Sequence, residues 1–300
     1  MGTLRIMSHN VWKCDRNLPA WEAKGEDCSA SARAKGIIRV YTDTHPDIIG
    51  FQEMSFVMAD EIILGLADKG LRYALLWGRD TPILYRQDRL ELLDSEFLLY
   101  PTEIPGWEGE FNNDGTKSWC AAVFRDKTDG KKLIFMTTHL WWKSSAPSSE
   151  NYQVGSDEAR AYQLNMAMDR LEKFHSEYGC PVVLVGDFNA AYTKPVIQSA
   201  LSRCYLHAHN IATEFADSDW GYHYCFGDGY KPYVKAPFEK AIDHIMVKFA
   251  PADFVRRFER YTPDYYLPLS DHSPVLWMCL CNFHHDKQPK NALPHRQSIF

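Results

Sequence analysis

The stretch Val182-Val183-Leu184-Val185-Gly186-Asp187-Phe188-Asn189 decides how the rest of the chain is interpreted. Its leading aliphatic residues are typical of a β-strand buried on both faces. Asp187 and Asn189 lie two positions apart, and an extended backbone directs both side chains to the same side. A carboxylate beside a carboxamide suits a hard cation such as Mg²⁺ or Mn²⁺ and a phosphate oxygen held next to it. A strand that ends in an Asx turn is equally compatible with these residues.

The composition indicates a globular chain with a large core. Of 300 residues, 45% are hydrophobic and 14% aromatic. No linker, repeat or charge block interrupts residues 1–282, which we interpret as one domain, followed by a polar C-terminal tail at 283–300. The net charge of −6 argues against a wide basic face for duplex nucleic acid, but not against a short strand or a nucleotide bound at a metal.

The cysteines give no sign of a structural metal or a disulfide framework. All eight are scattered, without the paired spacing of a zinc site. The sequence contains no recognisable signal peptide or transmembrane run, so we expect reduced thiols, a cytoplasmic protein and no membrane association. No feature indicates an obligate protein partner.

Hydrophobic periodicity and turn residues predict the succession of elements. Helices are expected at 30–44, from Ser55 to Asp68, at 157–178 and at 193–201. Strands are expected at 4–10, 47–53, 73–77, 82–86, 90–100, 118–124, 132–138, 182–185, 241–247 and 273–280.

Polar side chains gather at the ends of several predicted strands. They are Asn10, Gln52-Glu53, His139, Asp187 with Asn189, and Asp243-His244, while Ser270-Asp271-His272 comes just before the last strand. At one rim, these groups would form an acidic pocket that can bind a divalent cation, polarise phosphate and move protons. His244 follows Asp243 directly and should point to the opposite side of its strand, so we leave it out of the site.

The order of these polar motifs along the chain resembles that of the endonuclease/exonuclease/phosphatase superfamily, which has the deoxyribonuclease I-like fold. The motifs are Asn10, Gln52-Glu53, Thr138-His139-Leu140, Gly186-Asp187-Phe188-Asn189, Ile242-Asp243-His244-Ile245 and Ser270-Asp271-His272. The resemblance covers residues 3–280 and implies an α/β protein. Its expected architecture is a four-layer α-β-β-α sandwich of two mixed β-sheets with outer helices. It also implies hydrolysis of phosphate esters with Mg²⁺, or Mn²⁺, as the cofactor.

The resemblance further implies roles for the carboxylates and amides. Glu53 resembles the principal Mg²⁺ carboxylate, with Asn10 beside it and Asp271 completing the metal shell. Asp187 resembles the carboxylate that orients or deprotonates the attacking water. Asn189 resembles the amide that holds the phosphate.

Two histidines complete the implied catalytic set. His139 and His272 resemble the pair that binds the scissile phosphate and stabilises its growing charge. Asp243 resembles the carboxylate partner of His272.

Four further residues are candidates for contact with the substrate. Tyr85 could reach the phosphate or His139, or it could be a core tyrosine. Arg160 could face the pocket from its helix or be solvated. Trp141 and Trp220 lie in loops next to catalytic strand ends, where they could stack on a base or sugar or pack beneath the loop.

These features favour a Mg²⁺-dependent phosphodiesterase of the nuclease type. We expect it to act on a short single-stranded nucleic acid or a nucleotide-like diester, because an acidic chain lacks the basic track that a duplex needs. A phosphatase for a small soluble phosphomonoester and a catalytically idle phosphate-binding module are the alternatives.

Overall fold

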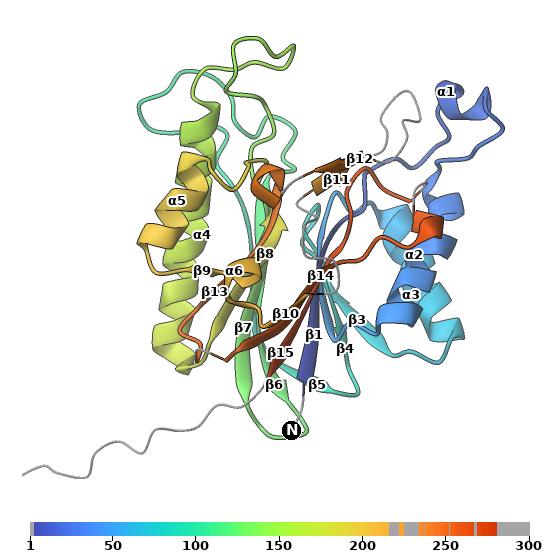
Figure 1. The fold of residues 1–300 in the computed structure, drawn as a ribbon, viewed down its shortest axis with the longest axis vertical. Helices are drawn as coiled ribbons and strands as arrows, with labels where there is room; N and C mark the ends of the chain where they lie inside the picture. Colours follow the sequence, from blue (N-terminus) through green and yellow to red (C-terminus); the bar gives the residue numbers. More distant parts are fainter. Residues whose placement is uncertain are drawn as a thin grey trace, which may run out of the picture.

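The structure, a computed structural model, has two facing β-sheets with helices on both outer sides (Figure 1). It describes residues 3–215, 222–224, 234–236, 238–251, 253–266 and 269–280. One outer layer contains α2 (Ala30–Thr44) and α3 (Phe56–Asp68). The other contains α4 (Ser156–Tyr178) and α5 (Pro195–Ser202). The predicted four-layer α-β-β-α sandwich is therefore confirmed.

Both sheets mix parallel and antiparallel strands. The first has seven strands in the order β10 (Glu214–Phe215), β14 (Val255–Arg260), β15 (Val275–Leu280), β1 (Thr3–Asn10), β2 (Ile48–Gln52), β4 (Ile83–Arg86) and β3 (Tyr73–Leu76). The second has six strands in the order β5 (Leu90–Leu99), β6 (Ser118–Asp126), β7 (Lys132–His139), β8 (Val182–Asp187), β13 (Asp243–Lys248) and β9 (Leu206–His207). Short elements complete the described chain, namely β11 (Tyr222–Tyr224) paired with β12 (Val234–Ala236), helices α1 (Pro19–Glu22) and α6 (Ala208–Ile211), and two 3₁₀ turns at Phe238–Lys240 and Asp264–Tyr266.

Apolar side chains fill the three interfaces between the four layers. Ile6 and Val185 come from opposite sheets and belong to the central cluster. Ile37 of α2 packs on the outer face of the first sheet, and Leu164 of α4 packs on that of the second. Each helix thus buries one apolar stripe, as its period of about 3.6 residues requires.

Strand direction decides which residues meet at one edge of the sandwich, which is called the functional edge below. β1 runs parallel to β2, and β7 runs parallel to β8. The hydrogen bond from Asn10 of β1 to Asp187 of β8 shows that these four strands end at the same edge of the sandwich. The antiparallel strands β4, β6, β13 and β15 begin there. The two sheets also lie close together at Gly50 of β2. A Cβ at this position would lie only 2.7 Å from side-chain atoms of Thr137 and Val185 in the second sheet. The close approach brings polar ends from both sheets together.

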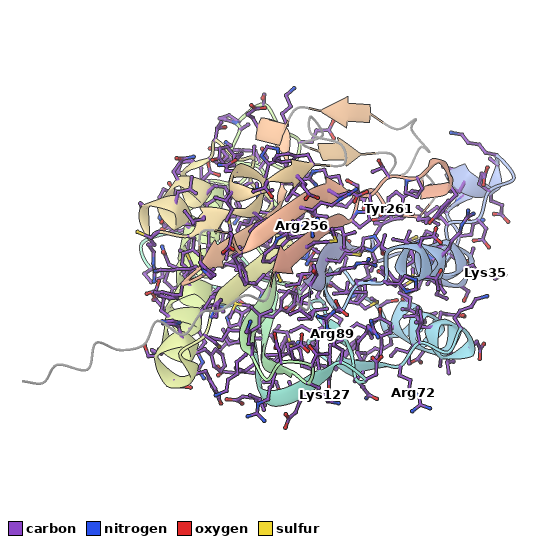
Figure 2. The ribbon with its side chains drawn as sticks, turned by 60° about the horizontal axis from the view of Figure 1, so that its bottom comes forward. Lys35, Arg72, Arg89, Lys127, Arg256 and Tyr261 are labelled. Atoms are coloured by element: carbon purple, nitrogen blue, oxygen red, sulfur yellow. The ribbon has the colours of Figure 1, made fainter. Side chains whose placement is uncertain are left out.

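The opposite end of the sandwich is held by Arg89, which is labelled in Figure 2. Its guanidinium donates to the carboxylate of Asp47 at 2.8 Å and to that of Asp126 at 3.1 Å. It also donates to the carbonyl oxygen of Thr3 at 2.7 Å. These contacts join the beginning of the first sheet to the end of β6 in the second.

Several sequence predictions need correction or fall outside the described residues. β14 was not predicted, because its sequence Val-Arg-Arg-Phe-Glu-Arg carries four charged residues and a register shift that breaks the alternation. β13 starts at Asp243, two residues later than expected. Residues 281–300, and with them the boundary at 282, lie outside the described chain. Among the helices that are described, none is long and apolar enough to cross a membrane.

Candidate active site

The functional edge brings the predicted catalytic residues from both sheets into one cluster. The backbone register places His139 of β7 opposite Asp187 of β8, and Asp243 of β13 opposite Asp187 from the other side. Asn10 lies opposite Gln52 at the ends of β1 and β2, directly before Glu53. This edge is the end of the sandwich toward which β1 runs from the N-terminus marked in Figure 1.

Glu53 is held in place by its backbone and by two donors. Its φ of 58° is left-handed, which turns the side chain sharply after β2. Asn10 Nδ2 donates to Oε1 at 3.1 Å, and the backbone N–H of Lys13 donates to Oε2 at 3.2 Å. Burial opposes ionisation, yet the electrostatic effects of His139 and Lys117 nearby hold the pKa of Glu53 at about 2. The carboxylate is therefore charged at any ordinary pH.

Asn10 connects the two central carboxylates. Its Nδ2 donates to Asp187 Oδ2 as well as to Glu53, at 3.1 Å in both cases. Its side-chain oxygen, Oδ1, accepts from the backbone N–H of Trp12 at 3.0 Å. In this orientation the side-chain NH₂ group of Asn10 faces the two carboxylates. A hydrogen-bond donor is suited to positioning carboxylates and not to ligating a metal.

Asp187 lies between two histidines. Its Oδ2 is 3.7 Å from Nε2 of His139 and 3.7 Å from Nε2 of His272. Gly186 is required before it, because a Cβ there would lie 2.0 Å from the carbonyl oxygen of Thr138. Burial raises the pKa of Asp187, although both histidines oppose that change.

The Asx turn that the sequence left open is also present. Asp187 Oδ1 accepts the backbone N–H of Asn189 at 2.8 Å, while Oδ2 remains directed at the histidines. Asn189 has a left-handed φ of 49°, and its Nδ2 donates to the carbonyl oxygen of Leu140 at 3.0 Å. The turn and a carboxylate oxygen directed at the histidines thus coexist, because the two oxygens of Asp187 have different partners.

His272 forms a buried ion pair with Asp243. Its Nδ1 lies 2.9 Å from Asp243 Oδ2. Burial disfavours the imidazolium, but the charges of Asp243 and Asp187 raise the pKa of His272 well above its usual value. Tyr266 donates its hydroxyl to the carbonyl oxygen of His272. The ring is therefore a fixed cation facing Asp187.

Asp271 adds a further acid beside this cluster. Ser270 Oγ donates to the backbone carbonyl oxygen of Asn10 at 2.7 Å, which connects the segment 270–272 to the end of β1. Burial, together with the charges of Glu53 and Asp187, raises the pKa of Asp271 to about 7, against the opposing effect of His272. Crowding of acidic groups on this scale favours a bound cation.

Two members of the cluster, Asp80 and Lys117, were not predicted. Asp80 Oδ2 lies 2.8 Å from His139 Nδ1. Lys117 Nζ lies 2.7 Å from His139 Nε2. Both residues are buried, and each precedes an antiparallel strand that begins at the functional edge. Their sequence pattern is a polar residue just before a strand, as in Ser270-Asp271-His272. This pattern identifies a site residue only when the direction of the strand, here β4 or β6, is known.

Arg33 supports the site from behind. Its side chain donates to five backbone carbonyl oxygens at distances of 2.6 to 2.9 Å. The acceptors are Val11, Trp12, Cys14, Cys28 and Leu269. Arg33 thereby links the loop after β1 to the segment that carries Asp271 and His272.

Tyr85 and Arg160 lie away from the cluster. Tyr85 pairs with Ile48 at the beginning of β2 and packs against Phe124 in the central core, because β4 runs antiparallel to β2. Arg160 is 3% exposed and donates to the carbonyl oxygens of Trp141 and Lys143, so it supports the loop after β7. The substrate contacts expected for these two residues therefore find no support.

The predicted stacking residues also need revision. Trp141 is 1% exposed and packs beneath its loop, with its ring centroid 6.0 Å from that of Phe111. Its neighbour Trp142 is 41% exposed and takes the outward position. Trp220 lies outside the described residues. A buried Trp141 cannot offer a ring face to a base.

The donor set fits a hard divalent cation. Carboxylate oxygens of Glu53 and Asp187 and a ring nitrogen of His139 lie within 4.8 Å of one another, and a second such group contains Asp187, Asp243 and His272. Mg²⁺ and Mn²⁺ prefer carboxylate oxygens, which dominate the first group. The low pKa of Glu53 and the raised pKa of Asp271 agree with a site that accepts added positive charge.

Comparisons with known proteins agree with this geometry. The profile of the Endonuclease/Exonuclease/phosphatase family matches residues 7–272. A search of curated proteins gave no match.

Solved structures share the fold at low sequence identity. The Bacteroides thetaiotaomicron mannosyl-6-phosphatase is 18% identical, with a TM-score of 0.70 over 92% of this chain and 99% of that one. The human Nocturnin catalytic domain with bound sulfate is 18% identical, with a TM-score of 0.61 over 93% and 94%. TDP2 of D. rerio, complexed with a single-strand DNA product, is 17% identical, with a TM-score of 0.60 over 93% and 100%.

Proposed function

The chain belongs to the endonuclease/exonuclease/phosphatase family, and we propose that it is a hydrolase that cleaves phosphate esters with a bound divalent cation, Mg²⁺ or Mn²⁺. The observation that carries the proposal is the carboxylate of Asp187, which lies 3.7 Å from His139 and 3.7 Å from His272. Glu53 lies beside it through their shared donor, Asn10. This combination supplies an acceptor for the proton of water and cationic groups for phosphate.

Glu53 would hold the cation, with Asp271 next to it. When bound, such a cation neutralises phosphate charge and favours ionisation of water. Glu53 is suited to this role because its pKa of about 2 keeps it charged. Asn10 fixes the orientation of its Oε1.

Asp187 would orient the attacking water and accept its proton. A raised pKa makes Asp187 a stronger base than an exposed aspartate. The turn that joins Oδ1 to Asn189 leaves Oδ2 directed at the reaction centre.

His272, His139 and Lys117 would stabilise the phosphate as its charge grows. His272 is kept protonated by Asp243, and the Lys117 ammonium contacts His139. Fixed cations in a buried site stabilise developing charge without reorganisation. The position of these groups around the Asp187 carboxylate disfavours an idle phosphate-binding module, which would need no proton acceptor there.

For the substrate, we propose a short single-stranded or nucleotide-like phosphodiester first, and a small soluble phosphomonoester second. The first agrees with the acidic net charge of −6, which suits no long duplex. The burial of Trp141 removes one base-stacking residue from this proposal. A pocket of about 550 Å³ that shares Asp80 with the site has the size for a small ester, which favours the second.

A turnover assay tests the proposal. Bis(para-nitrophenyl) phosphate and para-nitrophenyl phosphate represent the diester and monoester classes, each with Mg²⁺, with Mn²⁺ and with excess chelator. We expect turnover that the chelator abolishes and either metal restores. Turnover that persists in chelator would reject the metal-dependent mechanism, and binding without turnover would favour the idle module.

A further inference from the structure

His9 is a buried histidine directly behind the candidate active site. It precedes Asn10 in β1, and successive side chains of a strand point to opposite faces of the sheet. Asn10 faces the second sheet, where it donates to Asp187, whereas His9 faces α2 on the outer side. The ring of His9 is fully buried, which lowers its pKa to about 3 and keeps it neutral. A neutral imidazole has one N–H group, so one ring nitrogen donates and the other accepts.

Two buried tyrosine hydroxyls contact the ring of His9. The hydroxyl oxygen of Tyr41 in α2 lies 2.7 Å from Nδ1, and that of Tyr266 in the second 3₁₀ turn lies 2.8 Å from Nε2. Tyr266 also donates its hydroxyl to the backbone carbonyl oxygen of His272, an atom that can only accept. These contacts form a continuous hydrogen-bonded chain from α2 to the backbone of His272.

The last bond of this chain assigns the protons in the others. Tyr266 has a single hydroxyl proton and gives it to His272, so its oxygen must accept from Nε2 of His9. Nε2 therefore carries the proton of the neutral ring, and Nδ1 accepts the hydroxyl of Tyr41. In the opposite tautomer, Nε2 would accept the hydroxyl of Tyr266, and the carbonyl oxygen of His272 would lose its donor. The tautomer of His9 thus decides whether Tyr266 holds His272.

Backbone contacts on both sides set the position of His272. Its N–H donates to Ser270 Oγ at 3.1 Å, and its carbonyl oxygen accepts from Tyr266. From this position its ring lies 2.9 Å from Asp243 Oδ2 and 3.7 Å from Asp187 Oδ2. A shift of the backbone would change both distances, and misplacement of a reacting group by about 1 Å can cost about 100-fold in rate.

We propose that His9 is a positioning residue for catalysis, because its Nε2–H directs the hydroxyl of Tyr266 to the carbonyl oxygen of His272. The proposal rests on the proposed phosphoesterase function, in which His272 stabilises the phosphate. His9 faces away from the catalytic cluster and acts through Tyr266. The alternative is a histidine that only fills the core, and the two roles differ in how the effects of substitutions combine.

Histidine ¹⁵N NMR of the unaltered protein tests the proton assignment. We expect the signals of His9, identified by their loss in His9→Phe, to show a neutral ring with its proton on Nε2 at neutral pH. A proton on Nδ1 would overturn the proposal, because Tyr266 would then donate to His9 and not to His272. This measurement needs neither turnover nor a stable variant beyond the one used for assignment, which His9→Gln can replace.

Turnover of the para-nitrophenyl substrates tests whether His9 acts through Tyr266. Tyr266→Phe removes the hydroxyl and keeps the ring, and His9→Phe removes the N–H and keeps an aromatic side chain. We expect each to lower kcat about tenfold with little change in KM. The double variant should lose no more than Tyr266→Phe alone, because the hydroxyl through which His9 acts is already absent. Losses that multiply to about 100-fold in the double variant would indicate two independent defects and overturn the proposal.

Two further variants separate positioning from a general loss of stability. His9→Gln places an N–H close to the position of Nε2, so it should keep more of kcat than His9→Phe. Tyr205→Phe removes an equally buried hydroxyl, which donates to the carbonyl oxygen of Met168 between the second sheet and α4. We expect Tyr205→Phe to leave kcat unchanged. Equal losses in His9→Gln and His9→Phe, or in Tyr205→Phe and Tyr266→Phe, would contradict the positioning role.

The proton between His272 and Asp243 gives a readout that is independent of turnover. Nδ1–H of His272, bonded to Asp243 Oδ2, should give a downfield ¹H NMR signal that is lost in His272→Ala. We expect this signal to shift in Tyr266→Phe and His9→Phe and to stay in place in Tyr205→Phe. An unmoved signal in the first two variants would overturn the proposal. Absence of hydrolysis by the unaltered protein would reject the phosphoesterase, and this signal would still decide whether His9 positions His272.

Discussion

Lys117 Nζ lies 2.7 Å from Nε2 of His139, with both side chains buried. Burial lowers the pKa of Lys117, although the carboxylates of Asp80, Glu53 and Asp187 oppose that change. The fold thus holds the Lys117 amino group among three carboxylates beside the proposed phosphate position. Lys117 directly precedes β6, a strand that runs antiparallel to β7 and begins beside His139.

The first prediction concerns this ammonium. Lys117→Met keeps most of the apolar stem and removes the charge, so we expect kcat to fall by about 10²–10³, the usual loss for one group that stabilises developing charge. Lys117→Arg should retain more activity than Lys117→Met. Circular dichroism would verify folding. Turnover close to that of the unaltered protein in Lys117→Met would exclude Lys117 from the mechanism.

The second prediction concerns the pH profile. Asp243 raises the pKa of His272, so its removal should lower that pKa. Because the proposed mechanism needs protonated His272, the alkaline limb of the kcat/KM profile should move to lower pH in Asp243→Asn. The exposed Asp88 offers a control in Asp88→Asn. An unshifted alkaline limb in Asp243→Asn would contradict this role.

The third prediction concerns acid stability. Burial lowers the pKa of His9 to about 3 and that of His244 to about 4, and it lowers the pKa of His207 well below the usual 6.5. The unfolded chain therefore binds more protons below pH 6.5, and the stability that these neutral histidines contribute at pH 7 is lost as the pH falls toward 4.

Urea unfolding at pH 7 and pH 5 measures this effect. Replacing His244, which contacts His207 at 2.9 Å and the carbonyl oxygen of Ala190 at 2.7 Å, with glutamine should reduce the loss of unfolding free energy between the two pH values. The comparison is of the pH dependence, so a general destabilisation of His244→Gln does not affect it. An unchanged dependence would show that His244 is not neutral in the folded state.

The fourth prediction concerns Arg33. Arg33→Leu would leave five carbonyl oxygens, four of them buried, without their donor, so we expect the free energy of unfolding to fall by about 3 kcal/mol or more. Arg39→Leu, at an exposed position of the same helix, should change it little. Denaturant titration compares them. Similar stability for both variants would reject the supporting role of Arg33.

The sequence predicted the residues at the carboxyl ends of parallel strands better than those at the beginnings of antiparallel ones. His139 and Asp187 follow apolar runs and are recognisable from local pattern alone. Tyr85 was chosen from the wrong end of β4, whereas Asp80 at its other end contacts His139. The difference is the direction of β4, which depends on its pairing with β2 and not on its own residues.

The sequence also could not predict which side chains on the loops are exposed. Trp141 and Trp142 are adjacent and chemically identical, yet one is buried and the other is 41% exposed. The choice depends on Gln163, whose Oε1 accepts the backbone N–H of Trp141 at 2.8 Å, and on Arg160 beneath the same loop. Such tertiary contacts leave no local pattern in the sequence.

The most direct test of the central claim is turnover of a phosphate ester as a function of Mg²⁺ concentration in Glu53→Gln. The substitution keeps the shape of the side chain and removes the charge that would hold the cation. We expect a higher Mg²⁺ requirement and a saturating turnover about 100-fold or more below that of the unaltered protein. Glu158→Gln, at an exposed position on α4, should behave like the unaltered protein. Normal turnover of Glu53→Gln at limiting Mg²⁺ would contradict a metal-dependent phosphoesterase centred on Glu53.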